Sequence, residues 1–424
     1  MNEGIFTQDF LLPDTWQVER ISAPVATPIA DLHAAVCEAL HHPIAALPIA
    51  ELIGPGTRIC IATDGTGPAH FAVLNAVLDA AFEAGASSDD IVVLSTPPGY
   101  DPQELPVAQV LHDATDLRAV NELGRYEGVP LSVNHYAAEA DLLIGLGTLH
   151  LDDLLRDSGS QRLVGYEFGG SVTQRELDDT RFLDDRISPY RAGEPLFDRV
   201  VREGARRAGL VFIVDLLLDE GGRAVAIKAG APQKVNAELC LIAHTLREAD
   251  ASHAADLLVA DVGPVDLYSA ARAPIHIGLA PDTALVRGGV VVLPKLCAES
   301  SAEPAEVDAF YDALDLGASS DEVIQHLRGR ALGPGESRAY LLAHVMQHHP
   351  IIAISTPGAR TVRHIIAVND MTEATELAET MLGRRPHMLL LSRALSSLPV
   401  ASRFTHDKST DDMLSDLLDD MELE

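Results

Sequence analysis

The stretch RICIATDGTGPAH, residues 58–70, joins a short aliphatic run to a small, polar, glycine-rich loop. Residues 58–63 predict a buried strand, and the Ala-rich residues 69–85 predict an amphipathic helix that ends at a glycine. In open α/β sheets, ligands collect at the carboxyl ends of strands, and a glycine-rich turn before a helix suits an anion. We therefore expect this loop to face a ligand, although a simple helix-capping turn explains the same residues.

The strand–helix alternation continues along the chain and restarts near residue 253. Because aliphatic runs alternate with helical segments on both sides of that point, the sequence predicts two α/β domains with mainly parallel sheets and an interdomain cleft. We place the N-terminal domain at 1–252, the C-terminal domain at 253–400 and an acidic tail at 401–424. Strands are predicted at 91–95, 140–147, 255–263, 288–295 and 350–356, and helices at 27–52, 194–208, 233–250, 303–315, 319–328, 336–348 and 371–383.

The composition limits the function classes. The 424 residues carry a formal net charge of −32, which would repel nucleic acid and anionic membranes. No apolar run reaches the roughly 18 residues that a membrane span needs, and no leader is visible at the start. The four cysteines form no CxxC pair, which is typical of a reducing compartment. We expect a cytoplasmic protein that binds a small molecule, with neither a nucleic-acid nor a membrane partner.

Two other clusters draw attention but favour structural roles. His344 and His348 are spaced like metal ligands on a helix, but no HExxH pattern accompanies them. The carboxylates of Asp215, Asp219 and Glu220 are explained by a strand end and a hairpin turn. An acidic cluster with two nearby arginines is better explained as a salt-bridged loop than as a cation site. The cluster comprises Asp178, Asp179, Asp184 and Asp185. We predict no metal site.

Longer motifs carry a resemblance to a known family. The aliphatic strand that runs into D-x-T-x-P, at Asp64, Thr66 and Pro68, resembles the nickel-dependent lactate racemases. So does VNHYAAEADLLIGLG at 133–147, and three stretches of the second half resemble the C-terminal domain of that family. The resemblance covers most of residues 50–400, and it implies a lactate racemase-like domain at 1–252. The three stretches are 255–274, 285–299 and 336–355.

The resemblance implies a specific chemistry. Members bind a nickel-pincer nucleotide derived from nicotinate in a cleft between two α/β domains. A lysine holds the pyridinium ring, one histidine helps to hold nickel, and two histidines exchange the substrate proton. Racemising an unactivated α-hydroxyacid by loss of its C–H bond requires a hydride acceptor and a base on the hydroxyl group.

This sequence departs from the family at the chemically demanding positions. Gly65 and Gly67 stand where the family has arginines that clamp an anion. Tyr100 and Asp152 stand at the positions of the two catalytic histidines, and Arg162 replaces the cofactor lysine. The nickel histidine would fall near Asp178, whereas a gap at the second catalytic position would bring in His150.

These replacements change the chemistry that is possible. Arginine keeps a positive charge but is a poor amine nucleophile, and aspartate and glycine cannot replace imidazole ligands or cationic clamps. We therefore predict no cofactor, with a nickel-pincer nucleotide expected only where the family chemistry is retained.

Two hypotheses from different classes follow. In the first, a diverged lactate racemase-like protein binds or isomerises a small α-hydroxyacid at the cleft; as an enzyme it would be a 2-hydroxyacid racemase or epimerase. In the second, the same scaffold is a non-catalytic binding or assembly protein, in which the acidic tail contacts a partner or a second copy of the chain. A different cofactor in the same cleft is a third reading. Under the first, Asp64 and Thr66 position the ligand beside Gly65 and Gly67, Arg162 neutralises an anion, and Tyr100 or Asp152 handles protons.

Overall fold

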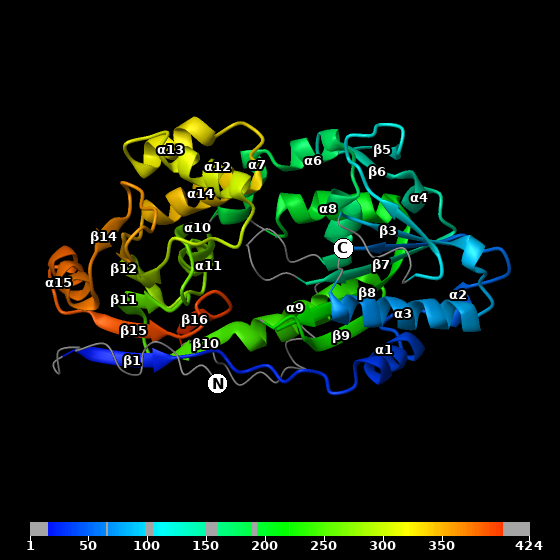
Figure 1. The fold of residues 1–424 in the computed structure, drawn as a ribbon, viewed down its shortest axis with the longest axis horizontal. Helices are drawn as coiled ribbons and strands as arrows, with labels where there is room; N and C mark the ends of the chain where they lie inside the picture. Colours follow the sequence, from blue (N-terminus) through cyan, green and yellow to red (C-terminus); the bar gives the residue numbers. More distant parts are fainter. Residues whose placement is uncertain are drawn as a thin grey trace.

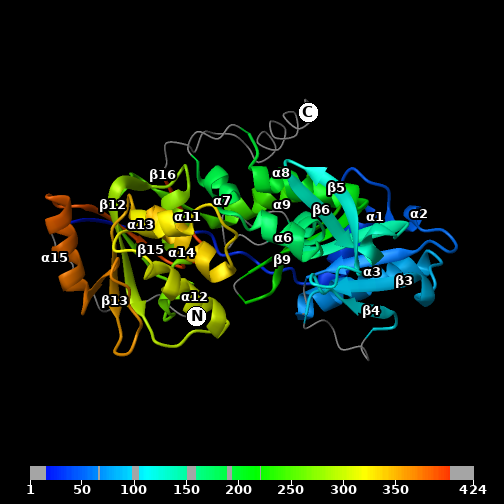
Figure 2. The same cartoon turned by 90° about the horizontal axis from the view of Figure 1, so that it is seen from above.

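Two six-stranded sheets, each flanked by helices, lie side by side along the long axis of the molecule (Figures 1 and 2). The computed structural model describes residues 16–64, 67–97, 105–149, 159–188, 193–219 and 221–401. Both sheets are mainly parallel, so the predicted class of two α/β domains is confirmed. No helix in these ranges is long and apolar enough to cross a membrane.

The first sheet reverses its strand order between its two central strands, β2 and β7. From β2 the chain moves to β3 on one side, and from β7 it moves to β8 on the other. Every neighbouring pair is parallel except β8 and β9, which form the predicted hairpin. The spatial order is β4 (Ala108–Leu111), β3 (Ile91–Ser95), β2 (Ile59–Thr63), β7 (Leu142–Thr148), β8 (Leu210–Leu218) and β9 (Ala224–Gly230).

Helices cover both faces of this sheet. Aliphatic residues of α1 and α3 pack on one face, and those of α8 and α9 pack on the other. The expected single helix at 27–52 is wrong: α1 ends before Pro43, and α2 begins after Pro48, because proline lacks the N–H that a helix interior needs. The helices are α1 (Leu32–His41), α2 (Ile49–Leu52), α3 (Pro68–Glu83), α4 (His135–Ala138), α5 (Gly159–Arg162), the π-helical turn Leu163–Glu167, α6 (Ser171–Leu177), α7 (Thr180–Ile187), α8 (Leu196–Arg207) and α9 (Pro232–Arg247).

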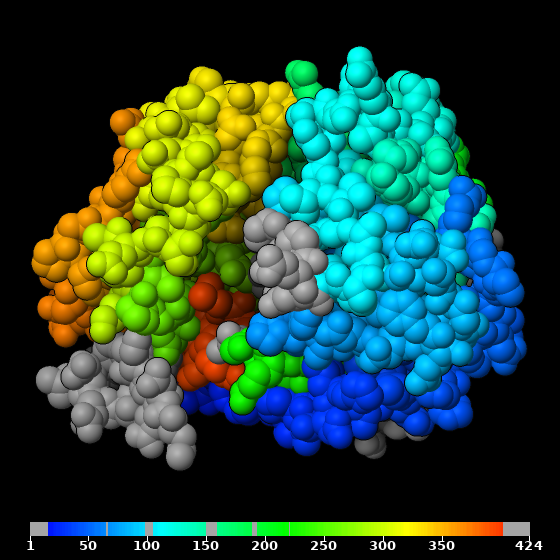
Figure 3. Space-filling model, turned by 45° about the vertical axis from the view of Figure 1, so that its right-hand side comes forward, coloured from blue at the N-terminus to red at the C-terminus, as the bar shows by residue number. Residues whose placement is uncertain are grey.

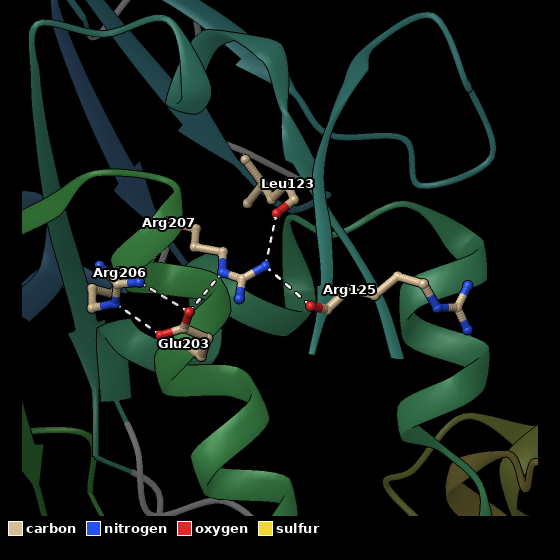
Figure 4. A network of polar contacts seen from close by, with 5 residues as sticks. All are labelled: Leu123, Arg125, Glu203, Arg206 and Arg207. Carbon is tan, nitrogen blue, oxygen red and sulfur yellow. Dashed lines mark hydrogen bonds and ion pairs between the residues drawn. The ribbon is translucent and has the colours of Figure 1, made fainter. Parts of the chain in front are cut away.

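A hairpin that the sequence did not predict is held against α8 by an arginine network (Figure 4). Arg207 donates to the carbonyl oxygens of Leu123, at 3.0 Å, and Arg125, at 3.2 Å. Glu203 accepts from Arg206 and from Arg207 at 2.8 and 2.6 Å. The network holds the hairpin against α8 in the first half. The hairpin strands are β5 (Val120–Tyr126) and β6 (Val129–Asn134).

The second sheet contains one strand from the start of the chain. Gln17–Ile21 pairs in parallel with His387–Leu391, so this strand lies with the C-terminal sheet although the expected boundary grouped it with 1–252. The division near residue 253 otherwise stays a prediction. The order is β1 (Gln17–Ile21), β15 (His387–Leu391), β11 (Ala255–Ala260), β12 (Leu285–Leu296), β13 (Ile351–Ser355) and β14 (Ile366–Val368), with a small sheet of β10 (Glu248–Ala251) and β16 (Leu398–Ala401).

Helices of the second half also cover both faces of their sheet. The α15 helix packs on one face, and α10 to α14 pack on the other. These helices are α10 (Leu267–Ala270), α11 (Arg272–Leu279), α12 (Pro304–Leu314), α13 (Ser320–Leu327), α14 (Pro334–Met346) and α15 (Met371–Leu382).

Helix α7 joins the two halves. Its Leu183 is buried in the core of the second half. The hydroxyl of Thr180 accepts from the main-chain N–H of Gly329 at 2.7 Å, and Tyr340 donates to Asp184 at 2.6 Å. These contacts tie α7 to the loop before α14 and to α14 itself, so this helix anchors the first half to the second.

Candidate functional site

The predicted ligand-facing loop begins where the strand order of the first sheet reverses. Strand β2 ends at Thr63 and its neighbour β7 ends at Thr148, so their carboxyl ends flank the crevice where open α/β sheets bind ligands. Asp64 follows β2 directly. Gly67 is the N-cap of α3, and Pro68 is its first residue, a position that proline favours. Gly65 and Thr66 lie outside the described residues.

A buried histidine joins the two sides of this crevice. The Nε2 atom of His70 lies 2.5 Å from the hydroxyl oxygen of Thr148 and 3.6 Å from a carboxylate oxygen of Asp64. The side chain is only 6% exposed. Helical side chains tilt toward the N-terminus of the helix, so the side chain of a residue in the first turn of α3 points back toward the end of β2. The sequence analysis did not select His70, although its position in the first turn of the helix after the loop could have indicated that it belongs to the site.

A second carboxylate lies beneath the crevice. Asp215 is fully buried inside β8, not at a strand end, and it accepts from both the hydroxyl and the main-chain N–H of Ser160. Ser160 approaches this closely because Gly145 and Gly147 have no side chains; a Cβ at either would meet it. Burial raises the pKa of Asp215 to about 6, and the charge of Asp64 adds to the rise. This carboxyl is therefore poised to change its charge near neutral pH.

Arg162, which was expected to neutralise an anion, has a carboxylate partner inside the protein. Its guanidinium lies 2.6 Å from Glu167 and stacks over the ring of Tyr166, 5.1 Å from its centroid. Tyr166 in turn donates to Asp178 at 2.6 Å. Burial and the Asp178 carboxylate raise the pKa of this phenol well above its ordinary value. Arg162 lines a small cavity of about 90 Å³ with Arg338 of the second half.

These side chains do not fit the nickel-pincer nucleotide that the resemblance implies. Arg162, which the resemblance aligns with the cofactor lysine, is a guanidinium ion-paired with Glu167, and Asp178, which it aligns near the nickel histidine, accepts a hydrogen bond from the phenol of Tyr166. Within the described ranges, no group of three His, Cys, Asp or Glu side chains is arranged to hold a metal ion. Tyr100, Asp152 and His150 lie outside the described residues.

The molecular surface is hollowed between the two halves (Figure 3). A larger cavity of about 500 Å³ is lined by residues of both halves. Thr148, which contacts His70, forms part of its wall, so the cavity adjoins the crevice. We call it the interdomain cavity. Its lining is Pro24, Val25, Ala26, Thr148, Leu149, Leu217, Leu218, Asp219, Gly221, Arg223, Val225, Leu246, Arg247, Arg393, Leu395 and Ser396.

The remaining candidates have local partners. His344 lies 3.7 Å from Asp184, and His349 is buried with its Nδ1 at 3.1 Å from the carbonyl oxygen of Gly289. Asp179 caps α7, and Asp185 accepts from the main-chain N–H of Leu196 at 2.7 Å, so both have structural roles, but the segment is helical and not the expected salt-bridged loop. Asp219 accepts from Gly221 and Arg223 and so closes the β8–β9 hairpin. The acidic tail from residue 402 onward lies outside the described residues.

Comparisons with known proteins agree with this fold. Residues 4–97 match the family model of the lactate racemase N-terminal domain. Lactate racemase from Thermoanaerobacterium thermosaccharolyticum is 22% identical over 282 residues, 65% of each chain, and that from Lactiplantibacillus plantarum is 23% identical over 297 residues, 68% of each chain. The alignment thus spans slightly less than two thirds of the first relative.

Two solved structures share this fold. The lactate racemase apoprotein from T. thermosaccharolyticum superposes with a TM-score of 0.74 at 20% identity, covering 92% of this chain and 96% of that one. A Thermotoga maritima protein superposes with a TM-score of 0.58 at 11% identity, covering 89% of this chain and all of that one. The solved structures show that the fold is shared, and the N-terminal domain match with the two lactate racemases supports a divergent lactate racemase-like chain.

Proposed function

We propose that the chain binds a small α-hydroxyacid where the crevice between β2 and β7 meets the interdomain cavity, and that it does so without nickel-pincer chemistry. The observation that carries the proposal is the convergence of Asp64, His70 and Thr148 at the point of strand reversal. A hydroxyl group can donate to the Asp64 carboxylate. The N-terminus of α3, which begins at Pro68, carries a partial positive charge that attracts a carboxylate.

If the bound acid is turned over, the reaction is an isomerisation at its α-carbon. Such chemistry needs a base on the hydroxyl group and a hydride acceptor, and without nickel-pincer chemistry that acceptor would have to be a different redox cofactor. The proximity of Asp64 to His70 supports Asp64 as the base. Tyr100 and Asp152 remain proposed proton carriers, and Thr66 a proposed ligand contact. Arg162 is proposed to bind an anion only when that anion displaces Glu167 from its guanidinium group.

Titration calorimetry with D- and L-lactate, paired with chiral chromatography, tests the proposal. We expect both enantiomers to bind, and Asp64→Asn to weaken binding about tenfold or more, because a hydrogen bond to a charged acceptor is lost. Asp79→Asn, on the exposed side of α3, is the matched control and should leave affinity unchanged. Purified protein that carries nickel on a pyridine ring joined to one of its side chains would contradict the proposal.

A non-catalytic binding or assembly role is the second candidate. The observation that favours it is that Arg162 and Asp178, at the reactive positions of the family, are engaged by Glu167 and Tyr166. Deleting residues 405–424 tests the part of this role assigned to the acidic tail. A change in oligomeric state by light scattering supports it, whereas an unchanged state and unchanged partner recovery remove it.

A further inference from the structure

The surplus of acidic groups is larger than solubility requires, and it is spread over both halves. Residues 22–247 contain 32 acidic and 17 basic side chains, and residues 248–401 contain 19 and 11. A small domain stays soluble with a net charge of about 2–8, whereas this chain has a net charge of −32. With 63 acidic and 31 basic side chains, fewer than half of the acidic groups can have a basic group of their own.

A long surface helix of the first half shows where such acidic groups lie. On α3, Asp79 and Glu83 are exposed one helical turn apart. Neither side chain has an ion-pair partner among the described residues, and no basic residue lies in the last turn of this helix. Like charges at this spacing repel each other, and an acidic group at the C-terminal end of a helix also opposes the helix dipole. Both effects destabilise the helix at low salt.

Two helices of the second half repeat this arrangement. On α12, Asp308 and Asp312 are exposed one turn apart, and of these two only Asp308 has an ion-pair partner among the described residues, Arg360 at 2.8 Å. On α15, Glu373 and Glu376 are exposed at a spacing of three residues. Neither helix has a basic residue in its last turn. Because α3 and α15 lie far apart in different halves (Figure 1), the repulsion belongs to the whole surface and not to a single patch.

The scarce positive charge is largely committed to ion pairs elsewhere in the fold. Four of the 31 basic residues are lysines, and the rest are arginines, whose guanidinium groups pair well with carboxylates. Arg186 lies 2.7 Å from Asp198, and Arg207 lies 2.6 Å from Glu203. Arginines that are engaged in this way do not offset the acidic groups on α3, α12 and α15.

Dissolved salt acts on attractive and repulsive charge contacts in opposite directions. Screening weakens exposed ion pairs, which add little stability, and it also weakens the repulsion that a large net charge imposes on the compact state. The repulsion is the larger effect here, because more than half of the acidic groups can have no basic partner. We propose that the folded chain reaches its full stability only in concentrated salt, near the molar range, where the screening length is about 3 Å instead of about 10 Å. This inference goes beyond the proposed hydroxyacid site, since no ligand is involved.

Thermal unfolding of the full chain over a series of KCl concentrations tests the inference. We expect the midpoint temperature to rise by about 5 °C or more between about 0.1 and 1 M KCl. Choline chloride at equal ionic strength should give a similar rise, because screening does not depend on the identity of the cation. A midpoint that stays constant or falls as KCl is added overturns the proposal. An equal rise in sucrose at equal osmolarity also overturns it, because an uncharged solute stabilises by exclusion from the surface.

A charge-reversal variant connects the salt dependence to the exposed helices. Glu83→Arg, Asp312→Arg and Glu376→Arg, combined in one chain, replace three exposed acidic groups by basic ones. We expect this variant to unfold about 3 °C or more above the wild type at low salt and to gain less from KCl. The matched control, Glu83→Asp with Asp312→Glu and Glu376→Asp, keeps the charge and should gain as much as the wild type. Equal gains for the reversed variant and the control overturn the proposal. Because no ligand is added, this result is independent of the lactate titration.

Discussion

The imidazole Nε2 of His70 lies 2.5 Å from the hydroxyl oxygen of Thr148, across the line where the strand order of the first sheet reverses. Thr148 also forms part of the wall of the interdomain cavity. A single hydroxyl therefore links the loop that follows β2 to the cavity between the halves. A change on one side of this link should therefore alter the other side.

Thr148→Val should destabilise the protein because a buried polar group loses its partner. Both side chains are almost fully buried, so the cost is about 1–3 kcal/mol in the free energy of unfolding. Urea denaturation measures it. Thr245→Val, on the exposed side of α9, is the control and should change stability by less than about 0.5 kcal/mol. Equal effects of the two changes would show that the His70–Thr148 contact adds nothing.

Asp215→Asn should remove a pH dependence of stability. The folded carboxyl has a pKa of about 6 against an ordinary 3.8, so its contribution is present below about pH 4 and is lost as the pH rises through 6. Two pKa units correspond to about 3 kcal/mol. The stability of the wild type relative to the variant should therefore fall by about that amount between pH 4 and 7. Parallel profiles of the two proteins would contradict this, and Asp79→Asn should give a parallel profile.

Arg162→Gln should destabilise the protein by about 2 kcal/mol because Glu167, which is 31% exposed, loses its positive partner. The double variant Arg162→Gln/Glu167→Gln should recover part of that loss, since it leaves no unpaired charge. A double-mutant cycle by chemical denaturation measures the coupling. The exposed pair Arg58–Asp141 is the control, with an expected coupling of less than about 1 kcal/mol. Similar couplings for both pairs would show that burial does not strengthen the first.

Thr180→Val should weaken the attachment of α7 to the second half. The hydroxyl is buried, and it accepts from Gly329 at 2.7 Å, so the expected loss is about 1–2 kcal/mol. Hydrogen exchange should show faster exchange at the Gly329 amide. Thr380→Val, on the exposed side of α15, should alter neither quantity. An unchanged exchange rate at Gly329 would argue against this anchor.

Local pattern was sufficient for much of the fold. The aliphatic run at 58–63 forms β2, and the Ala-rich segment at 69–85 forms α3. The helix expected at 27–52 is interrupted at Pro43 and Pro48. The prolines are a local signal for this break, but the helical spacing of apolar residues across them led to the expectation of one helix. Local signals of this kind lie within a few residues of their effects, which is why reading along the chain can find them.

The candidate site was harder to predict because its members come from separate strands and helices. Asp64 could be selected from the sequence because it adjoins the glycine-rich loop. His70 is recognisable as part of the site only through its contact with Thr148, 78 positions away. Asp215 looked like part of a hairpin turn, whereas β8 buries it beneath the crevice. Arg162 was chosen as an anion partner, and only the packing of the π-helical turn after it brings Glu167 to its guanidinium.

The sequence by itself determined the α/β class and the strand–loop–helix unit at 58–85. Tertiary structure alone decided where the strand order reverses, that β1 pairs with the C-terminal sheet, and that Arg393 is oriented by Ala23, 370 positions earlier. The physical reason is that periodicity and capping act over one or two turns of chain. Strand pairing, burial and cavity formation depend on contacts between segments that are far apart in the sequence. No local sequence pattern records which distant segments will meet.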